Sequence, residues 1–249
     1  MAVEALMNGP TDLETVVFDL DGTLVDTAPE IQFSLNEALR EMNFPPMHLM
    51  QVKEQVGKGG LAMVEAALAH AGQQTTPERI RMMQRLYEMN CRVNLGTRSL
   101  VYPGVFDLLM RLRSDGIRLA ICTNKLSNFA EPLLEHMRLR PYFSAVVCGD
   151  TLKIMKPSSE PLLKAIDEIG GQPTRSLMVG DTDIDLKCAE DSGVASAWVR
   201  FGYQDKRRLS RQPDIVVGAY SEFYQTLADR GYRVVGLGCV APIVVRVER

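Results

Sequence analysis

Polar side chains follow four short apolar runs of this chain, and they are the residues whose types and spacing could carry out a reaction. Each run has the length of a buried strand, and the polar residues come directly after it or one short loop later. In chain order they are Asp19, Asp21, Thr123, Asn124, Lys156, Asp181 and Asp185. Because ligands of open parallel sheets bind beyond the carboxyl ends of the strands, we expect these side chains to meet in one crevice.

This set of side chains suits phosphoryl transfer through a covalent carboxylate. An aspartate such as Asp19 can attack phosphorus to give an aspartyl phosphate. A carboxylate that approaches a phosphate dianion is repelled unless cations screen both charges, so we predict a hard divalent ion such as Mg²⁺. Its ligands would come from Asp19, Asp181 or Asp185. The main chain near Asp21 would add another.

The other polar groups have places in the same reaction. Lys156 and the Thr123 hydroxyl would hold the phosphoryl oxygens, and Asn124 would orient the site. Asp21, two positions after the nucleophile, can give a proton to the leaving alkoxide and later take one from water. Gly22 lets the backbone come close to the phosphate.

The elements that must position these residues are predicted to be the strands of a parallel sheet. The apolar runs are Thr15–Phe18, Leu119–Cys122, Ala145–Cys148, Leu177–Val179, Ser196–Val199 and Ile215–Val217. Segments with helical spacing of their apolar residues separate most of them. Continuous apolar strands that alternate with helices indicate an α/β protein whose sheet is covered on both faces.

Residues from about 30 to 97 interrupt this alternation. Their spacing predicts a helix over 29–42, a glycine-rich loop at 57–60 that opens into an Ala-rich helix ending near 71, and a third helix over 76–94. No convincing strand lies among them. We therefore predict a helical insertion between the first strand and the rest of the sheet.

Composition and charge exclude several other classes of protein. Lys plus Arg number 28 and Asp plus Glu 31, for a formal net charge of −3, so no basic excess favours nucleic acid or an anionic membrane. The five cysteines include no Cys-x-x-Cys pair, which fits reduced thiols in a cytosol. The three histidines lie far apart, which argues against zinc and against a Ser/His/Asp triad. With no secretory signal or membrane-spanning run evident, we expect a soluble, cytoplasmic protein.

The chemically important stretches resemble the four ordered motifs of the haloacid dehalogenase-type phosphatases. These stretches are Asp19-Leu20-Asp21-Gly22-Thr23-Leu24-Val25-Asp26, Thr123-Asn124, Lys156-Pro157 and Gly180-Asp181 with Asp185. The likeness extends over about residues 13 to 203 and implies a Rossmann-like core with a helical cap of subclass I. It also implies that Asp19 is the nucleophile and a metal ligand and that Asp21 is the acid/base with a main-chain metal contact.

The same resemblance assigns the remaining roles. It makes Thr123 and Lys156 phosphate ligands, Asp181 a direct Mg²⁺ ligand and Asp185 its support. Within the family, the stretches 102–105, 121–125, 147–151 and 201–203 look most like bacterial phosphoglycolate phosphatases. The loop Val56-Gly57-Lys58-Gly59-Gly60 resembles a loop of that group, and we expect Lys58 or the Gly59 amide to meet the carboxylate or hydroxyl end of the substrate.

The sequence thus predicts a discontinuous core over 1–29 and 98–230, a cap over 30–97 and a C-terminal extension over 231–249. The extension has no assigned role, and an edge pair of strands or a dimer contact is open for it. The predicted substrate is a small phosphorylated metabolite, first of all 2-phosphoglycolate, with a sugar phosphate or a nucleotide monophosphate as the alternative. A catalytically silent phosphate-binding module would be expected to lose Asp19, Asp21, Lys156 or Asp181, and none is missing. A monomer and a homodimer are both open.

Overall fold

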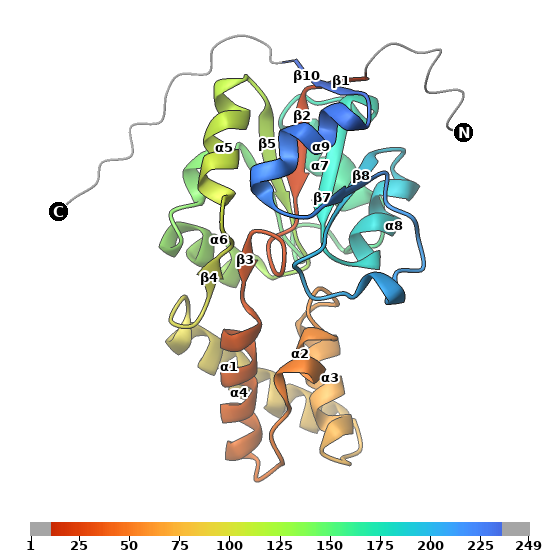
Figure 1. The fold of residues 1–249 in the computed structure, drawn as a ribbon. Coiled ribbons are helices and arrows are strands. Elements are labelled where there is room, and N and C mark those ends of the chain that lie inside the picture. The colour runs from red at the N-terminus through yellow and green to blue at the C-terminus, as the bar shows by residue number, and fades with distance from the viewer. Residues whose placement is uncertain (1–10, 236–249) are drawn as a thin grey trace, which may run out of the picture.

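The central sheet is parallel and six-stranded, as the computed structural model of residues 11–235 shows (Figure 1). The strand order is β6-β5-β2-β7-β8-β9. The bounds are β2 (Thr15–Phe18), β5 (Arg118–Cys122), β6 (Ala145–Val147), β7 (Ser176–Gly180), β8 (Ala195–Val199) and β9 (Ile215–Val217). The predicted α/β class is confirmed, and β2 lies inside the sheet between β5 and β7.

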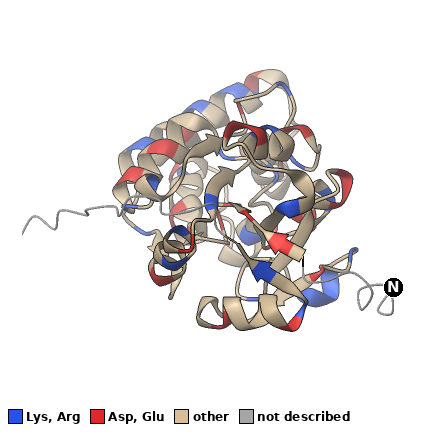
Figure 2. Cartoon of the chain, turned by 90° about the horizontal axis from the view of Figure 1, so that it is seen from above, with Lys and Arg blue, Asp and Glu red and all other residues tan. Residues whose placement is uncertain are grey.

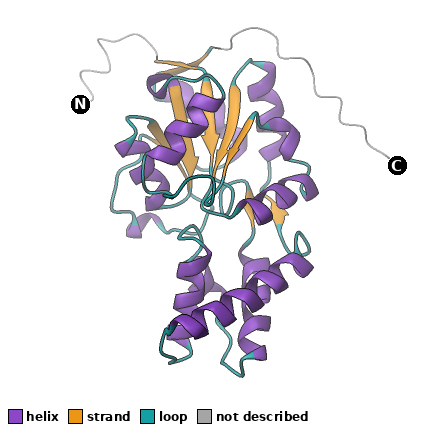
Figure 3. Ribbon diagram, turned by 180° about the vertical axis from the view of Figure 1, so that it is seen from behind, coloured by secondary structure: helices purple, strands orange, loops and turns teal. Residues whose placement is uncertain are grey.

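Helices cover both faces of this sheet (Figure 3). Successive strand residues point to opposite faces, so Val16 and Phe18 join one apolar cluster and Val17 joins the other. One face is covered by α5 (Val105–Ser114), α6 (Ser127–His136) and α9 (Phe223–Asp229). The other is covered by α7 (Glu160–Glu168) and α8 (Asp183–Asp191). Burial on both faces explains why the strands read as unbroken apolar runs.

The insertion is helical, as predicted, and has an apolar core of its own. It consists of α1 (Ala28–Glu41), α2 (Leu49–Lys53), α3 (Gly60–His70) and α4 (Pro77–Asn94). Leu35, Leu39, Val64, Leu68 and Met83 are buried in that core. Thr76 caps α4 by accepting a hydrogen bond from the Arg79 N–H, and Pro77 occupies its first turn.

Short elements connect the insertion to the sheet, and the sequence did not predict them. The chain leaves the core through β3 (Val25–Asp26) and returns through β4 (Leu100–Val101), which pair antiparallel. The helical turn α2, which comes before the glycine loop, was not predicted either. Two-residue strands and single helical turns carry too little periodicity to be seen in a sequence.

At the far end of the core, β1 (Thr11–Leu13) pairs in parallel with β10 (Tyr232–Val234). Tyr232 and Val234 are partly buried against the core cluster, so the start of the predicted C-terminal extension packs on the core. Residues 236–249, which make up the rest of that prediction, lie outside the described residues.

Four short 3₁₀ turns lie between the longer elements of the described residues. The turns are η1 (Arg140–Tyr142), η2 (Pro173–Arg175), η3 (Lys206–Arg208) and η4 (Tyr220–Glu222). Acidic and basic residues are mixed over the helices in Figure 2, in keeping with the small net charge. Within residues 11–235, no helix combines the length and the apolar character needed to cross a membrane.

Candidate active site

The parallel sheet brings the predicted residues to its carboxyl edge, on the side of the helical insertion (Figure 1). Asp19 continues the strand ladder beyond β2, since its N–H donates to the Val179 carbonyl at 2.9 Å. Thr123 continues β5 in the same way, with its N–H 2.9 Å from the Val147 carbonyl. Their positions are therefore fixed by backbone pairing rather than by a flexible loop.

Lys156 and three carboxylates form a buried cluster at this edge. The Lys156 ammonium lies 2.8 Å from Asp19 Oδ1 and 2.6 Å from Asp185 Oδ1. Oxygens of Asp19, Asp181 and Asp185 lie within 4.8 Å of one another, and all three residues are buried. Residues from three separate parts of the chain thus share one small volume.

The cluster holds three carboxyl groups beside a single ammonium. Burial raises the pKa of Asp19 to about 7, although the Lys156 ammonium acts in the opposite direction. Burial also raises the pKa of Asp181, and the neighbouring Asp185 charge adds to the rise. For Lys156, burial acts to lower the pKa, but the charges of Asp185 and Asp19 outweigh it and raise the pKa. One ammonium cannot balance three carboxylates, so this volume favours a further cation.

The donor set fits Mg²⁺. Asp19, Asp181 and Asp185 offer only carboxylate oxygens, which are the ligands that hard divalent ions prefer. No sulfur or imidazole belongs to this group.

Neighbouring residues hold the carboxylates Asp181 and Asp185 in place. The Tyr203 N–H donates to Asp181 Oδ2 at 2.6 Å, and the Trp198 indole N–H donates to the Asp181 carbonyl at 2.9 Å. Asp185 Oδ2 accepts from the Thr182 N–H at 3.1 Å and from the Thr182 hydroxyl at 2.8 Å. Each carboxylate therefore keeps its orientation without depending on a bound ion.

Gly22 packs directly against the same group. Its φ is +83°, and a Cβ built there would lie 2.5 Å from Asp181 Oδ2 and 2.7 Å from the Tyr203 ring. Its N–H donates to the Val25 carbonyl at 2.8 Å. The structure thus shows a close approach of Gly22 to Asp181, whereas the approach to a phosphate stays a prediction.

Asp21 has two partners, Thr27 and Lys125, and the sequence analysis predicted neither. The Thr27 hydroxyl donates to Asp21 Oδ1 at 2.7 Å, and the Lys125 ammonium lies 3.0 Å from Oδ1 and 3.2 Å from Oδ2. Burial acts to lower the pKa of Lys125, but the Asp21 charge outweighs it and raises the pKa. The available signal was the position of Lys125 directly after Thr123-Asn124, at the same strand end.

Asn124 connects the site to the insertion. Its amide N–H group donates to the Gly57 carbonyl and to the Lys156 carbonyl, each at 2.8 Å, and its Oδ1 accepts from the Lys156 N–H at 3.0 Å. The side chain therefore fixes the backbone of Lys156 and the glycine loop at once. The Thr123 hydroxyl accepts the Lys125 N–H at 3.2 Å.

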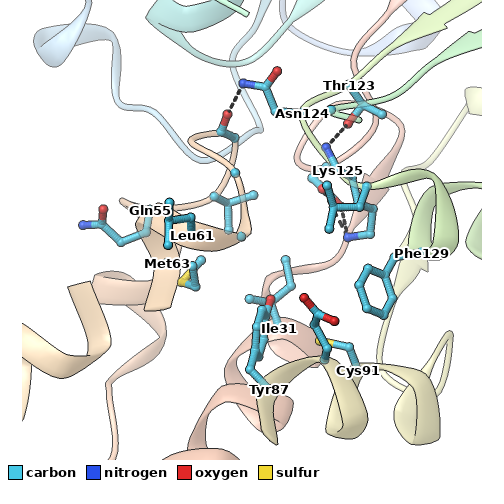
Figure 4. A pocket seen from close by; sticks show the side chains of 18 of the residues that line it. Ile31, Gln55, Leu61, Met63, Tyr87, Cys91, Thr123, Asn124, Lys125 and Phe129 are labelled. Atoms are coloured by element: carbon cyan, nitrogen blue, oxygen red, sulfur yellow. Dashed lines mark hydrogen bonds and ion pairs between the residues drawn. The ribbon is translucent and has the colours of Figure 1, made fainter. Parts of the chain in front are cut away.

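A cavity of about 280 Å³ lies between the carboxyl edge of the sheet and the insertion (Figure 4). Asp19, Asp21, Thr123, Asn124 and Lys125 line it from the core. From the insertion it is lined by residues of α1, α3, α4 and the glycine loop, including Gly57 and Gly59.

Lys58, predicted to meet the substrate, lies outside this cavity lining. Its side chain is exposed, and its ammonium lies 3.2 Å from Gln55 Oε1. Gly59 does line the cavity. The structure thus brings together the predicted residues of the core and leaves Lys58 apart from them.

Comparison with known proteins agrees with this geometry. Over residues 16–199 the chain matches the model of the haloacid dehalogenase-like hydrolases. It is 35% identical over 214 residues to a phosphoglycolate phosphatase of Agrobacterium fabrum, covering 86% of this chain and 92% of that protein. A phosphoglycolate phosphatase of Caulobacter vibrioides is 34% identical over 207 residues, covering 83% and 87%.

A solved structure shares the fold. The crystal structure of a predicted phosphoglycolate phosphatase from Haemophilus somnus superposes with a TM-score of 0.79 at 28% identity, covering 86% of this chain and 97% of that one. The region that matches the family model includes the insertion and every residue of the buried cluster. The chain belongs to the haloacid dehalogenase-like hydrolase family.

Proposed function

We propose that this protein is a Mg²⁺-dependent phosphomonoesterase that acts through an aspartyl phosphate on Asp19, with 2-phosphoglycolate as its first expected substrate. The observation that carries the chemistry is the buried cluster of Lys156 with Asp19, Asp181 and Asp185, which opens into the cavity at Asp19. The names of the relatives that cover most of the chain support the choice of substrate.

In the first half of the reaction, an Asp19 carboxylate oxygen bonds to phosphorus as the bond to the ester oxygen breaks. Asp21 gives the leaving alkoxide its proton, and the Thr27 hydroxyl and Lys125 hold Asp21 in position. Lys156 and Thr123 would bind the other phosphoryl oxygens. Bound Mg²⁺ would screen the repulsion between the Asp19 carboxylate and the phosphate dianion.

In the second half, water attacks phosphorus and Asp21 takes its proton. The acyl phosphate bond breaks, inorganic phosphate leaves, and the Asp19 carboxylate is restored. Asp21 thus acts first as acid and then as base, which requires a side chain that stays near both the leaving oxygen and the incoming water. The two hydrogen-bond partners of Asp21 keep it at the cavity wall for both steps.

The test of this function is phosphate release from 2-phosphoglycolate, hexose phosphates and nucleotide monophosphates, each with Mg²⁺ and with EDTA. We expect turnover with Mg²⁺ only, and the highest kcat/KM for 2-phosphoglycolate. Mg²⁺-dependent turnover that is highest for a sugar phosphate or a nucleotide would support the proposed phosphomonoesterase reaction but would contradict 2-phosphoglycolate as the preferred substrate. No release from any ester would favour the silent phosphate-binding module.

Lys125 is the residue that we expect to serve the carboxylate of 2-phosphoglycolate. It is the basic side chain among the described residues that line the cavity. We expect Lys125→Gln to lower kcat/KM for 2-phosphoglycolate by about 10- to 100-fold, the usual effect of losing a hydrogen bond to a charged group. The kcat/KM for ethyl phosphate, which lacks the carboxylate, should fall much less in this variant.

Steady-state kinetics on both esters check this expectation, with Lys153→Gln as the control because Lys153 is an exposed lysine outside the cavity lining. An equal loss on the two esters would mean that Lys125 acts only through Asp21, and the carboxylate contact would have to be abandoned.

A further inference from the structure

The part of the cavity that lies away from Asp19 is mainly apolar. Figure 4 shows side chains from the insertion and from the core that border the same space. The apolar lining includes Ile31, Leu61, Met63, Tyr87, Phe129 and Met155. Leu61 is 52% exposed and Met155 37% exposed, so these two present apolar surface that the protein itself does not cover. Exposed apolar surface in a concave site favours an apolar ligand group.

The charges on this wall disfavour a second anionic group. Glu30 and Glu88 line the cavity beside the apolar residues. Glu30 accepts from the Ser99 hydroxyl at 3.0 Å and from the Arg98 N–H at 3.2 Å, and Glu88 accepts from the Gln84 amide at 2.8 Å.

Lys125 already shares its ammonium with both oxygens of Asp21. Lys125 can therefore bind no more than one small anionic group of a ligand. The rest of the cavity wall, which includes Glu30 and Glu88, favours an uncharged ligand group.

The room in the cavity exceeds what a two-carbon leaving group needs. Its volume of about 280 Å³ is close to the roughly 300 Å³ at which pockets begin to enclose drug-sized ligands. A glycolate group bound at Lys125 would leave Leu61, Met63 and Met155 uncovered. Water against such apolar side chains gains few hydrogen bonds, so an apolar group that displaces it is favoured.

We propose that this site also hydrolyses phosphomonoesters whose leaving alcohol is uncharged, apolar and larger than glycolate, such as a benzyl-type alcohol held between the insertion and the core. The phosphoryl group takes the place at Asp19, and the alcohol's apolar part contacts Leu61 and Met155. This activity rests on the phosphomonoesterase chemistry proposed above, and it is independent of 2-phosphoglycolate as a substrate.

The experiment compares benzyl phosphate with ethyl phosphate on the wild-type protein with Mg²⁺. Both release primary alcohols of similar acidity, so intrinsic reactivity is matched and the apolar ring is the main difference. We expect kcat/KM for benzyl phosphate to exceed that for ethyl phosphate by about 10-fold or more. Equal values, or a preference for ethyl phosphate, would overturn the proposal.

Two variants locate the effect. Leu61→Asn should lower the benzyl-to-ethyl ratio of kcat/KM by about 3- to 10-fold, because it places an amide against the ring. Met82→Asn is the matched control, since Met82 is 53% exposed but lies outside the cavity lining, and its ratio should equal that of the wild type. If the benzyl-to-ethyl ratio of kcat/KM is unchanged in Leu61→Asn, the assignment of Leu61 to the wall that contacts the alcohol is wrong.

The outcomes separate this proposal from the proposed function. If no ester releases phosphate, the phosphomonoesterase chemistry fails, and the further activity fails with it. If 2-phosphoglycolate is hydrolysed and benzyl phosphate is not, only the further activity fails. If benzyl phosphate is preferred and 2-phosphoglycolate is not hydrolysed, the substrate of the proposed function fails and the further activity stands.

Discussion

Asp19→Asn is expected to lower phosphate release on the order of 10⁵-fold, to near the level of buffer, while the fold is kept. Losing the group that forms the covalent bond has an effect of this size in other enzymes that use a covalent intermediate. An asparagine at this position keeps the shape of the side chain but loses the negative charge and the second carboxylate oxygen. Neither Lys156 nor Thr123 can replace that nucleophile.

Stability should change little in this variant. Lys156 keeps its partner Asp185 at 2.6 Å, so its ammonium is not left unpaired. The amide introduced by the substitution still offers an oxygen to that ammonium, and one of the mutually repelling carboxylates is gone. We therefore expect a melting temperature in EDTA equal to or above that of the wild type.

The measurements are phosphate release under saturating Mg²⁺ and thermal unfolding with EDTA. Asp167→Asn is the matched control, because Asp167 is an exposed aspartate of α7 away from the cavity. Activity in Asp19→Asn within tenfold of the wild type would show that another group attacks phosphorus. A large fall in melting temperature would show instead that Asp19 is needed for folding.

The core of the fold was predictable because the apolar pattern of its segments matches their burial in the folded sheet. The inner strands β2 and β7 are buried along their whole length, so each is a short, mainly apolar run, and an aspartate follows each of them. The insertion was predictable for a related reason, since α4 begins at a threonine cap followed by proline and has a clear helical spacing.

The strand order and the pairing of β1 with β10 were not predictable in this way. These two strands are far apart in the chain, and neither three-residue strand has a periodicity of its own. Their pairing depends on where the chain returns after the whole core has formed.

The residues of the candidate site also differ in how well the sequence could predict them. Asp19 and Asp181 follow strands, so the order of the motifs was enough to predict that they meet. Lys125 and Lys58 were harder, because both are flexible lysines and only the packing of the insertion on the core decides which one lines the cavity. The structure places Lys125 there and Lys58 outside.

Gly22→Ala is expected to have the second largest effect, through Asp181. The added methyl group would lie 2.5 Å from Asp181 Oδ2, the same oxygen that accepts the Tyr203 N–H at 2.6 Å. The carboxylate must therefore move, and a shift of about 1 Å near a reacting centre can lower the rate about 100-fold. We expect that loss in kcat/KM, together with at least a tenfold rise in the Mg²⁺ concentration for half-maximal activity.

The positive φ of Gly22 adds a cost that the experiment must separate from displacement of the carboxylate. An alanine with φ near +83° is strained by about 1–2 kcal/mol relative to glycine. Gly193→Ala provides the matched control, because Gly193 has φ +63° and no atom lies within 4 Å of a Cβ built there. Gly193→Ala should carry a similar conformational cost and should therefore also lower the melting temperature.

Activity titrated with Mg²⁺ and thermal unfolding of both variants distinguish the two effects. If Gly22→Ala alone needs more Mg²⁺, the displaced Asp181 carboxylate belongs to the ion's site. If the two variants lose the same stability and keep the same Mg²⁺ dependence, Asp181 does not hold the ion. In that case the close packing of Gly22 would serve the fold, and the ion's ligands would have to be sought in Asp19 and Asp185 alone, because these remain the other carboxylates of the buried group.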